Sequence, residues 1–160
     1  MSFSRIISLN TTLSKLCEFL SRRECRGYIV GGFVRDWLLD RPTNDIDIAV
    51  DTNALSIAED VAKDLGGKFV LLDEVNDIAR VVITRKEQQK EPSQNRISRG
   101  TEWHLDFSSF SGDIETDLAR RDFTINALAT ELNPSNIATV SRDPRPSIPC
   151  PTEKKKQPKN

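Results

Sequence analysis

The sequence carries little excess charge of either sign, and this limits what its overall electrostatics can do. Its 160 residues have a formal net charge of -1 at pH 7, although residues 151–160 alone hold four lysines and one glutamate. The remainder of the chain is therefore mildly acidic. Domains that bind nucleic acid through their overall charge are strongly basic. This chain lacks that signature, so any contact with a polyanion must come from local basic patches.

Cysteine and histidine are also scarce. The three cysteines, Cys17, Cys25 and Cys150, have spacings that fit neither a zinc site nor a dense disulfide framework. We expect them to be reduced thiols that serve only packing. The one histidine, His104, is expected to be structural as well.

Long hydrophobic runs are absent. No apolar run approaches the roughly 20 residues that span a bilayer, and the N-terminus lacks the apolar core of a secretory signal. A cytoplasmic location is expected by default; the alternative is targeting by the serine-containing start before Glu18, the first acidic residue. Apolar residues make up 37% and charged residues 29% of the chain, as in ordinary globular domains, and the length allows one such domain.

The spacing of apolar residues predicts an α/β domain with a small mixed sheet flanked by helices. Helical periodicity predicts helices over residues 10–27, 33–39, 54–65 and 117–129. Period-two alternation and β-rich runs predict strands over residues 28–30, 45–50, 68–72, 78–84 and 103–107. The polar stretch 85–101 is expected to be a surface loop. We place the domain over residues 1–132 and a disordered tail, rich in proline and lysine, over residues 133–160.

An acidic pair on one predicted strand is the first candidate for chemistry. In the segment 45–50, Asp45 and Asp47 alternate with apolar residues, so both carboxylates should point to the same face of a sheet. Two such carboxylates can share divalent cations, and paired metals can activate an attacking oxygen and stabilise a leaving one in phosphoryl transfer. Solvated charges on an edge strand are the more common explanation of a lone acidic pair. The pair therefore needs context.

A double glycine supplies that context. Gly31 and Gly32 lie between the predicted strand 28–30 and the predicted helix 33–39, thirteen residues before the acidic pair. Glycines at such a turn let backbone amides approach a triphosphate, and a helix N-terminus adds favourable partial charge. A lone glycine pair is usually only a turn. Coupled to the acidic strand, it combines a phosphate cradle and metal ligands in one unit.

Two sequence motifs together resemble a known family. Residues 31–36 (GGFVRD) and 44–48 (NDIDI) closely resemble the first motif of the class II tRNA CCA-adding enzymes and bacterial poly(A) polymerases. Residues 120–128 (RRDFTINAL) resemble the Arg-Arg-Asp signature of the same family, in the same order along the chain. The resemblance covers residues 27–130 and implies the head domain of a polymerase-beta-type nucleotidyltransferase.

The resemblance also implies roles for particular residues. Asp45 and Asp47 would bind catalytic Mg²⁺, and Gly31 and Gly32 would face the phosphates of the incoming nucleotide. Arg35, with Asp36, would support that turn and belong to the nucleotide-binding set.

Further nucleotide contacts are implied for the second motif. Arg121 and Asp122 would contact ribose and phosphates, with Arg120 and Asn126 close by, because carboxylates accept from sugar hydroxyls and guanidinium forks bind phosphate. The alternative is a solvated helix start with Asn126 as a local capping group. Asp106, on a later strand, is a further candidate metal ligand, with plain surface solvation as the equal alternative. The implied chemistry needs no histidine base.

The function implied is transfer of a nucleotide from CTP or ATP to an RNA 3′ end, with tRNA as the expected RNA. The family's neck, body and tail domains are not expected in this chain, so a second chain could supply them. The short link 107–116 after the strand of Asp106 is typical of CC-adding relatives. If a longer protein or a partner chain supplies the neck, we therefore expect CC addition rather than addition of the final A. Two alternatives remain: a catalytically silent head that binds nucleotide or RNA, and a compact transferase that modifies another molecule.

Overall fold

The computed structural model describes residues 3–39, 41, 43–85, 101–119, 128–134 and 136, with side chains omitted for residues 3–8, 37, 38, 85 and 101. The chain forms four helices and six strands within these ranges. In chain order they are α1 (Phe3–Arg22), β1 (Gly27–Val30), α2 (Gly32–Leu38), β2 (Asp45–Val50), α3 (Ala54–Leu65), β3 (Lys68–Asp73), β4 (Ile78–Arg85), β5 (Thr101–Ser109), α4 (Ile114–Ala119) and β6 (Ala129–Glu131). The predicted α/β class is confirmed.

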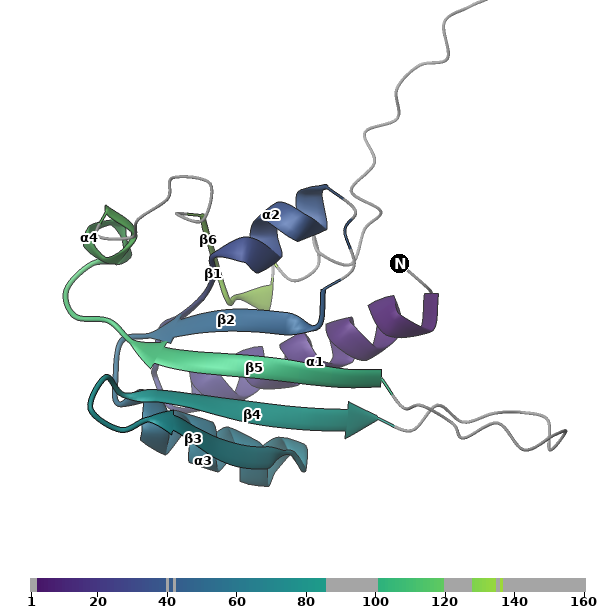
Figure 1. Ribbon diagram of the computed structural model, residues 1–160, viewed down its shortest axis with the longest axis horizontal. Coiled ribbons are helices and arrows are strands. Elements are labelled where there is room, and N and C mark those ends of the chain that lie inside the picture. The colour runs from purple at the N-terminus through teal and green to yellow at the C-terminus, as the bar shows by residue number, and fades with distance from the viewer. Residues whose placement is uncertain are drawn as a thin grey trace, which may run out of the picture.

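All six strands belong to one mixed sheet with the order β3-β4-β5-β2-β1-β6 (Figure 1). Strands β2 and β5 are parallel, and the other neighbouring pairs are antiparallel. Helices α1 and α3 lie together behind the sheet in Figure 1, while α2 lies beside β2 and β1. We call the face away from α1 and α3 the open face of the sheet.

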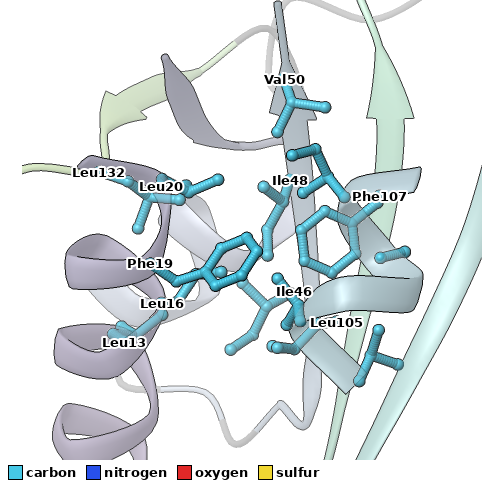
Figure 2. Close-up of a cluster of buried hydrophobic side chains, with 14 of the residues drawn as sticks. Leu13, Leu16, Phe19, Leu20, Ile46, Ile48, Val50, Leu105, Phe107 and Leu132 are labelled. Carbon is cyan, nitrogen blue, oxygen red and sulfur yellow. The ribbon is translucent and has the colours of Figure 1, made fainter. Parts of the chain in front are cut away.

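The core lies between the sheet and the two helices behind it. Strand β2 sends Ile46, Ile48 and Val50 to this side, and each has 0% of its surface exposed. Side chains of α1 point at them, and Figure 2 shows both sets together with Leu105 and Phe107 of β5. Burying one such side chain contributes roughly 1.5–3 kcal/mol. A smaller apolar cluster of Val30, Ala49, Phe110 and Ile114 holds α4 against the other face.

The start of α3 is capped by polar side chains from its own N-cap and from the β3–β4 turn. Asn53 caps α3, since its side chain accepts a hydrogen bond from the Ser56 N–H at 2.8 Å. The carboxylate of Asp77, in the β3–β4 turn, accepts from the N–H groups of Ala54 and Leu55 at 2.8 and 3.1 Å. These bonds satisfy N–H groups that have no partner within the helix and tie the hairpin to α3.

The predicted boundaries of β2 and α3 are confirmed, and the strands 28–30, 68–72, 78–84 and 103–107 are each found one to four residues longer. Helix α1 begins at Phe3 rather than near Asn10, because Leu9 continues the buried stripe one turn earlier. Helix α4 begins at Ile114 rather than at residue 117. There the side chain of Asp113 caps it by accepting from the Thr116 N–H at 2.7 Å.

The prediction of a helix reaching Ala129 was wrong at its end. Ala129 opens strand β6, where it pairs with Val30, and the register continues to Glu131 beside Tyr28. Three residues at the edge of the sheet are too few to show period-two alternation in the sequence. Residues 120–127 lie outside the described part, as do residues 86–100 of the predicted loop 85–101 and residues 137–160 of the predicted tail. The two end residues of that loop belong to β4 and β5.

The two described cysteines are free thiols that pack in or against the core cluster. Cys17 is buried and its thiol donates to the Leu132 carbonyl at 3.3 Å, while Cys25 is half-buried and also free. Burial raises the pKa of the Cys25 thiol to about 11, so it stays protonated and unreactive at neutral pH. Within the described residues, no helix combines the length and the hydrophobicity that crossing a membrane requires.

Candidate functional site

Asp45 and Asp47 lie on the open face of β2, on the other side of the strand from Ile46, Ile48 and Val50. The alternation that buries Ile46 and Ile48 forces both aspartates outward, as the sequence predicts. The Asp45 side chain is 61% exposed, and Asp47 is half-buried. Two carboxylates therefore stand next to each other at the surface of a rigid central strand.

The glycine turn lies directly against this pair. Gly31 joins β1 to α2 with a φ of +73°, and a Cβ atom at this position would sit 2.9 Å from Oδ2 of Asp47. Both the left-handed backbone and the lack of space require glycine here. The Gly31 N–H donates to the carbonyl of Leu128 at 3.0 Å. Gly31 thus makes room for the Asp47 carboxylate, a contact that the sequence did not predict.

The next two predicted residues, Arg35 and Asp36, are paired with each other on α2. Arg35 holds Asp36 in a fork, with Nε to Oδ1 at 2.9 Å and Nη2 to Oδ2 at 2.8 Å. This hydrogen bonding by Arg35 lowers the pKa of Asp36 and raises the pKa of Arg35. The guanidinium also lies beside Gly32, since a Cβ atom there would sit 3.1 Å from its Nη2. The structure therefore places Arg35, Asp36 and Gly32 together at one turn.

Asp106 lies beside Asp47 on the neighbouring strand. The parallel register of β2 and β5 aligns the two residues, so both carboxylates are on the open face. Both oxygens of Asp106, however, are bonded to Arg80 of β4: Nε to Oδ1 at 2.6 Å and Nη2 to Oδ2 at 2.7 Å. This hydrogen bond raises the pKa of Arg80. The same guanidinium lies 4.0 Å from Oδ1 of Asp45.

His104 also contacts the acidic pair. Its Nδ1 lies 2.9 Å from Oδ1 of Asp45, and its Nε2 lies 2.8 Å from Oε1 of Glu102. Hydrogen bonding to Glu102, and then to Asp45, raises the pKa of the imidazole. The expectation of a purely structural histidine missed this contact, because it depends on β5 lying beside β2.

The donor set fits a divalent cation in part. Carboxylate oxygens at Asp45 and Asp47 suit Mg²⁺, which is usually held by one or two carboxylates together with substrate phosphates. In the part of the chain that the structure describes, no group of three acidic, histidine or cysteine side chains is arranged to hold a metal ion. Asp106 is near enough in register to contribute, but Arg80 engages both of its oxygens.

Most of the second motif lies outside the residues that the structure describes. Arg120, Arg121, Asp122 and Asn126 lie in the segment 120–127. The described chain resumes at Leu128, whose carbonyl accepts from Gly31 beside the acidic pair.

Trp103 on β5 belongs to the core. None of its surface is exposed, so it offers no surface on which a base could stack.

Curated relatives of this chain are RNA nucleotidyltransferases. A CC-adding tRNA nucleotidyltransferase of Geobacter sulfurreducens is 38% identical over 136 residues, which cover 83% of this chain and 28% of the relative. An A-adding tRNA nucleotidyltransferase of Halalkalibacterium halodurans is 32% identical, and the match covers 30% of that relative. Poly(A) polymerase I of Haemophilus influenzae is 34% identical, and the match covers 26% of its length. The chain thus spans less than a third of these relatives.

Solved structures agree with this similarity. The Thermotoga maritima CCA-adding enzyme complexed with tRNA superposes with a TM-score of 0.59 at 36% identity, over 82% of this chain and 27% of that one. A complex of a CCA-adding enzyme with CTP gives the same TM-score at 34% identity. The model of the poly A polymerase head domain matches residues 27–142, which include the glycine turn, the acidic pair and the second motif. The chain therefore belongs to the poly A polymerase head domain family.

Proposed function

We propose that this chain transfers a nucleotide from an NTP to the 3′ hydroxyl of an RNA, with pyrophosphate as the leaving group. The observation that carries the proposal is the acidic pair on the open face of β2. Asp45 and Asp47 project from a strand whose other side is fixed in the core, and Gly31 leaves room for the Asp47 carboxylate. This arrangement suits metal-assisted phosphoryl transfer, in which the protein supplies positioning and charge.

Asp45 and Asp47 would hold Mg²⁺, which neutralises charge on the reacting phosphate oxygens when it is bound. His104 would orient Asp45 through its 2.9 Å contact. Gly31 would position Asp47, while Gly32 and the Arg35–Asp36 fork would form the wall that faces the phosphates.

By resemblance, the second motif would contact ribose and phosphates. These residues are Arg120, Arg121, Asp122 and Asn126. Their side-chain types suit sugar hydroxyls and phosphate oxygens.

The relatives indicate the substrate class. Those named above act on tRNA or make poly(A), and the matched structures include complexes with tRNA, CTP and ATP. We therefore assign CTP and ATP as candidate nucleotides and a tRNA 3′ end as the acceptor.

CTP is the preferred nucleotide of the two. Strand β5 ends at Ser109 and α4 begins at Ile114, so only four residues join them. By the resemblance described above, a short connection after the strand of Asp106 is typical of CC-adding enzymes. A CC-adding relative is also 38% identical to this chain. Efficient A addition to a tRNA that ends in CC would contradict this preference.

A second candidate function is that of a head that binds nucleotide or RNA without completing the transfer by itself. The observation that favours it is that the chain spans less than a third of its curated relatives.

The decisive experiment incubates the purified chain with Mg²⁺, each labelled NTP, and tRNAs that end before, within and after CCA. The matched control is Asp45→Asn/Asp47→Asn, checked for folding by circular dichroism. We expect CMP incorporation by the wild-type chain and none by the control. A folded wild-type chain that binds Mg²⁺ and CTP without incorporation would contradict autonomous transfer and support the binding head. Labelling of a protein or small molecule in place of RNA would identify a different acceptor.

A further inference from the structure

The ion pair between Arg80 and Asp106 is the feature that the proposed function leaves unexplained. Asp106 stands in register with Asp47, on the same face, where a further carboxylate would strengthen a cation site. Arg80 instead occupies both of its oxygens at 2.6 and 2.7 Å. Arg80 itself was not among the residues that the sequence singled out.

The position of Arg80 is set by the register of three strands. Asp47, Asp106 and Arg80 are successive partners across β2, β5 and β4, so their side chains form one row on the open face. Neighbouring strands are about 4.8 Å apart, which places the Arg80 backbone about 10 Å from that of Asp47. The guanidinium must extend toward β2 to reach Asp106, and this also brings it to 4.0 Å from Asp45.

The pair is sheltered enough to hold its geometry. The side chains of Arg80 and Asp106 are 31% and 19% exposed, whereas Asp45 is 61% exposed. A bidentate fork between a guanidinium and a carboxylate is stronger and more directional than a single charged contact. A cation that recruits Asp106 must therefore first displace Arg80.

We propose that Arg80 is a positioning residue that withholds Asp106 from the divalent cation in the nucleotide-free head, so that Asp45 and Asp47 alone hold the ion. This inference rests on the proposed function, because it assumes that the acidic pair binds the cation. It assigns Asp106 a different role from the one that the sequence suggested: in the free chain it is the partner of Arg80 and not a metal ligand.

The test measures Mn²⁺ affinity by electron paramagnetic resonance, without nucleotide or RNA, on the full chain. Arg80→Gln removes the fork and frees Asp106, and we expect Mn²⁺ to bind about tenfold more tightly. Asp106→Asn with Arg80 intact should change the affinity by less than about twofold, because the carboxylate is already withheld. The double variant Arg80→Gln/Asp106→Asn should return to near the wild-type affinity.

Two further variants distinguish the effect of the bidentate Arg80–Asp106 contact on Mn²⁺ affinity from the effect of positive charge alone. Lys68→Gln removes one positive charge from the same face, three strands from Asp45, and should leave the affinity within about twofold of wild type. Arg80→Lys keeps the charge but cannot grip both oxygens, and should bind Mn²⁺ several-fold more tightly than wild type. Thermal unfolding of each variant checks that the fold persists.

The outcomes distinguish this inference from the proposed function. A roughly tenfold loss of affinity in Asp106→Asn would overturn the inference, because Asp106 would already be a ligand. Equal affinities of wild type and Arg80→Gln would also overturn it. If Asp45→Asn/Asp47→Asn leaves Mn²⁺ binding unchanged, the metal site of the proposed function fails instead.

Discussion

The two sides of strand β2 have different roles, although they are built from alternate residues of one short segment. Ile46, Ile48 and Val50 are fully buried against α1 and β5 and hold the strand in place. Asp45 and Asp47 face outward from the same backbone, beside Arg80 and His104. The residues that stabilise the fold are therefore different from those proposed to carry the chemistry. Substitutions on the buried side should alter stability, and substitutions on the outward side should alter catalysis.

The largest expected effect is the loss of catalysis when the outward-facing aspartates of β2 are replaced. Asp45→Asn/Asp47→Asn removes the proposed metal ligands while preserving side-chain shape, and nucleotide incorporation should fall by about 10³-fold or more. Thermal unfolding should stay the same or move to higher temperature, because two neighbouring negative charges are removed. A variant that loses activity only because it is unfolded would break the comparison.

The inward side should give the largest effect on stability. Phe107→Ala empties a fully buried position on β5, and we expect the free energy of unfolding to fall by about 3–5 kcal/mol in denaturant titrations. The matched control is Val75→Ala, at a turn residue that is 93% exposed, which should stay within about 0.5 kcal/mol. Comparable losses for both variants would contradict the location of the core.

Gly31 and Gly66 offer a matched pair that separates backbone strain from site geometry. Both have positive φ, +73° and +68°, but a Cβ atom at Gly66 meets nothing within 4 Å, whereas at Gly31 it meets Asp47. Each alanine substitution should cost about 1–2 kcal/mol in unfolding free energy. Only Gly31→Ala should also slow incorporation, because it displaces the Asp47 carboxylate. Equal activity of the two variants would mean that this contact does not matter.

The smallest expected effect concerns the Arg35–Asp36 fork. Hydrogen bonding by Arg35 lowers the pKa of Asp36 below its unfolded value, so its stabilisation is present above the unfolded pKa and is lost as pH falls through the folded one. Asp36→Asn should therefore lower the melting temperature slightly at pH 7. We expect the difference from wild type to shrink in acid, below about pH 4. A difference that is constant with pH would contradict the assignment.

Much of the fold could be predicted because its elements have clear periodicity. Asp45 and Asp47 alternate with apolar residues at the start of the segment 45–50. Residues 54–65 are followed by Gly66, which adopts the left-handed conformation that ends a helix. The sequence did not predict strand β6, because three residues are too few to show a period-two pattern. Ala129 is extended because it pairs with Val30 of β1. The local sequence pattern predicts long elements. The position of a short edge strand depends instead on its pairing with the neighbouring strand of the sheet.

Only those residues of the site that lie close together in the sequence could be predicted. Asp45, Asp47, Gly31 and Gly32 lie within one short segment, so their spacing carries the information. Arg80 and His104 join them through the strand order β4-β5-β2, which no local pattern specifies. The one available signal was Arg80 itself, a charged residue among the apolar residues of the segment 78–83.

The central claim is tested most directly by the initial rate of CMP incorporation per folded molecule, measured for variants of the two sides of β2. Ile48→Val trims the buried side at a cost of about 0.5–1.5 kcal/mol and should retain the wild-type rate within a few-fold. Asp45→Asn/Asp47→Asn alters the outward side and should show no incorporation above background. Retained incorporation in the aspartate variant, or an equal loss in both, would contradict the account.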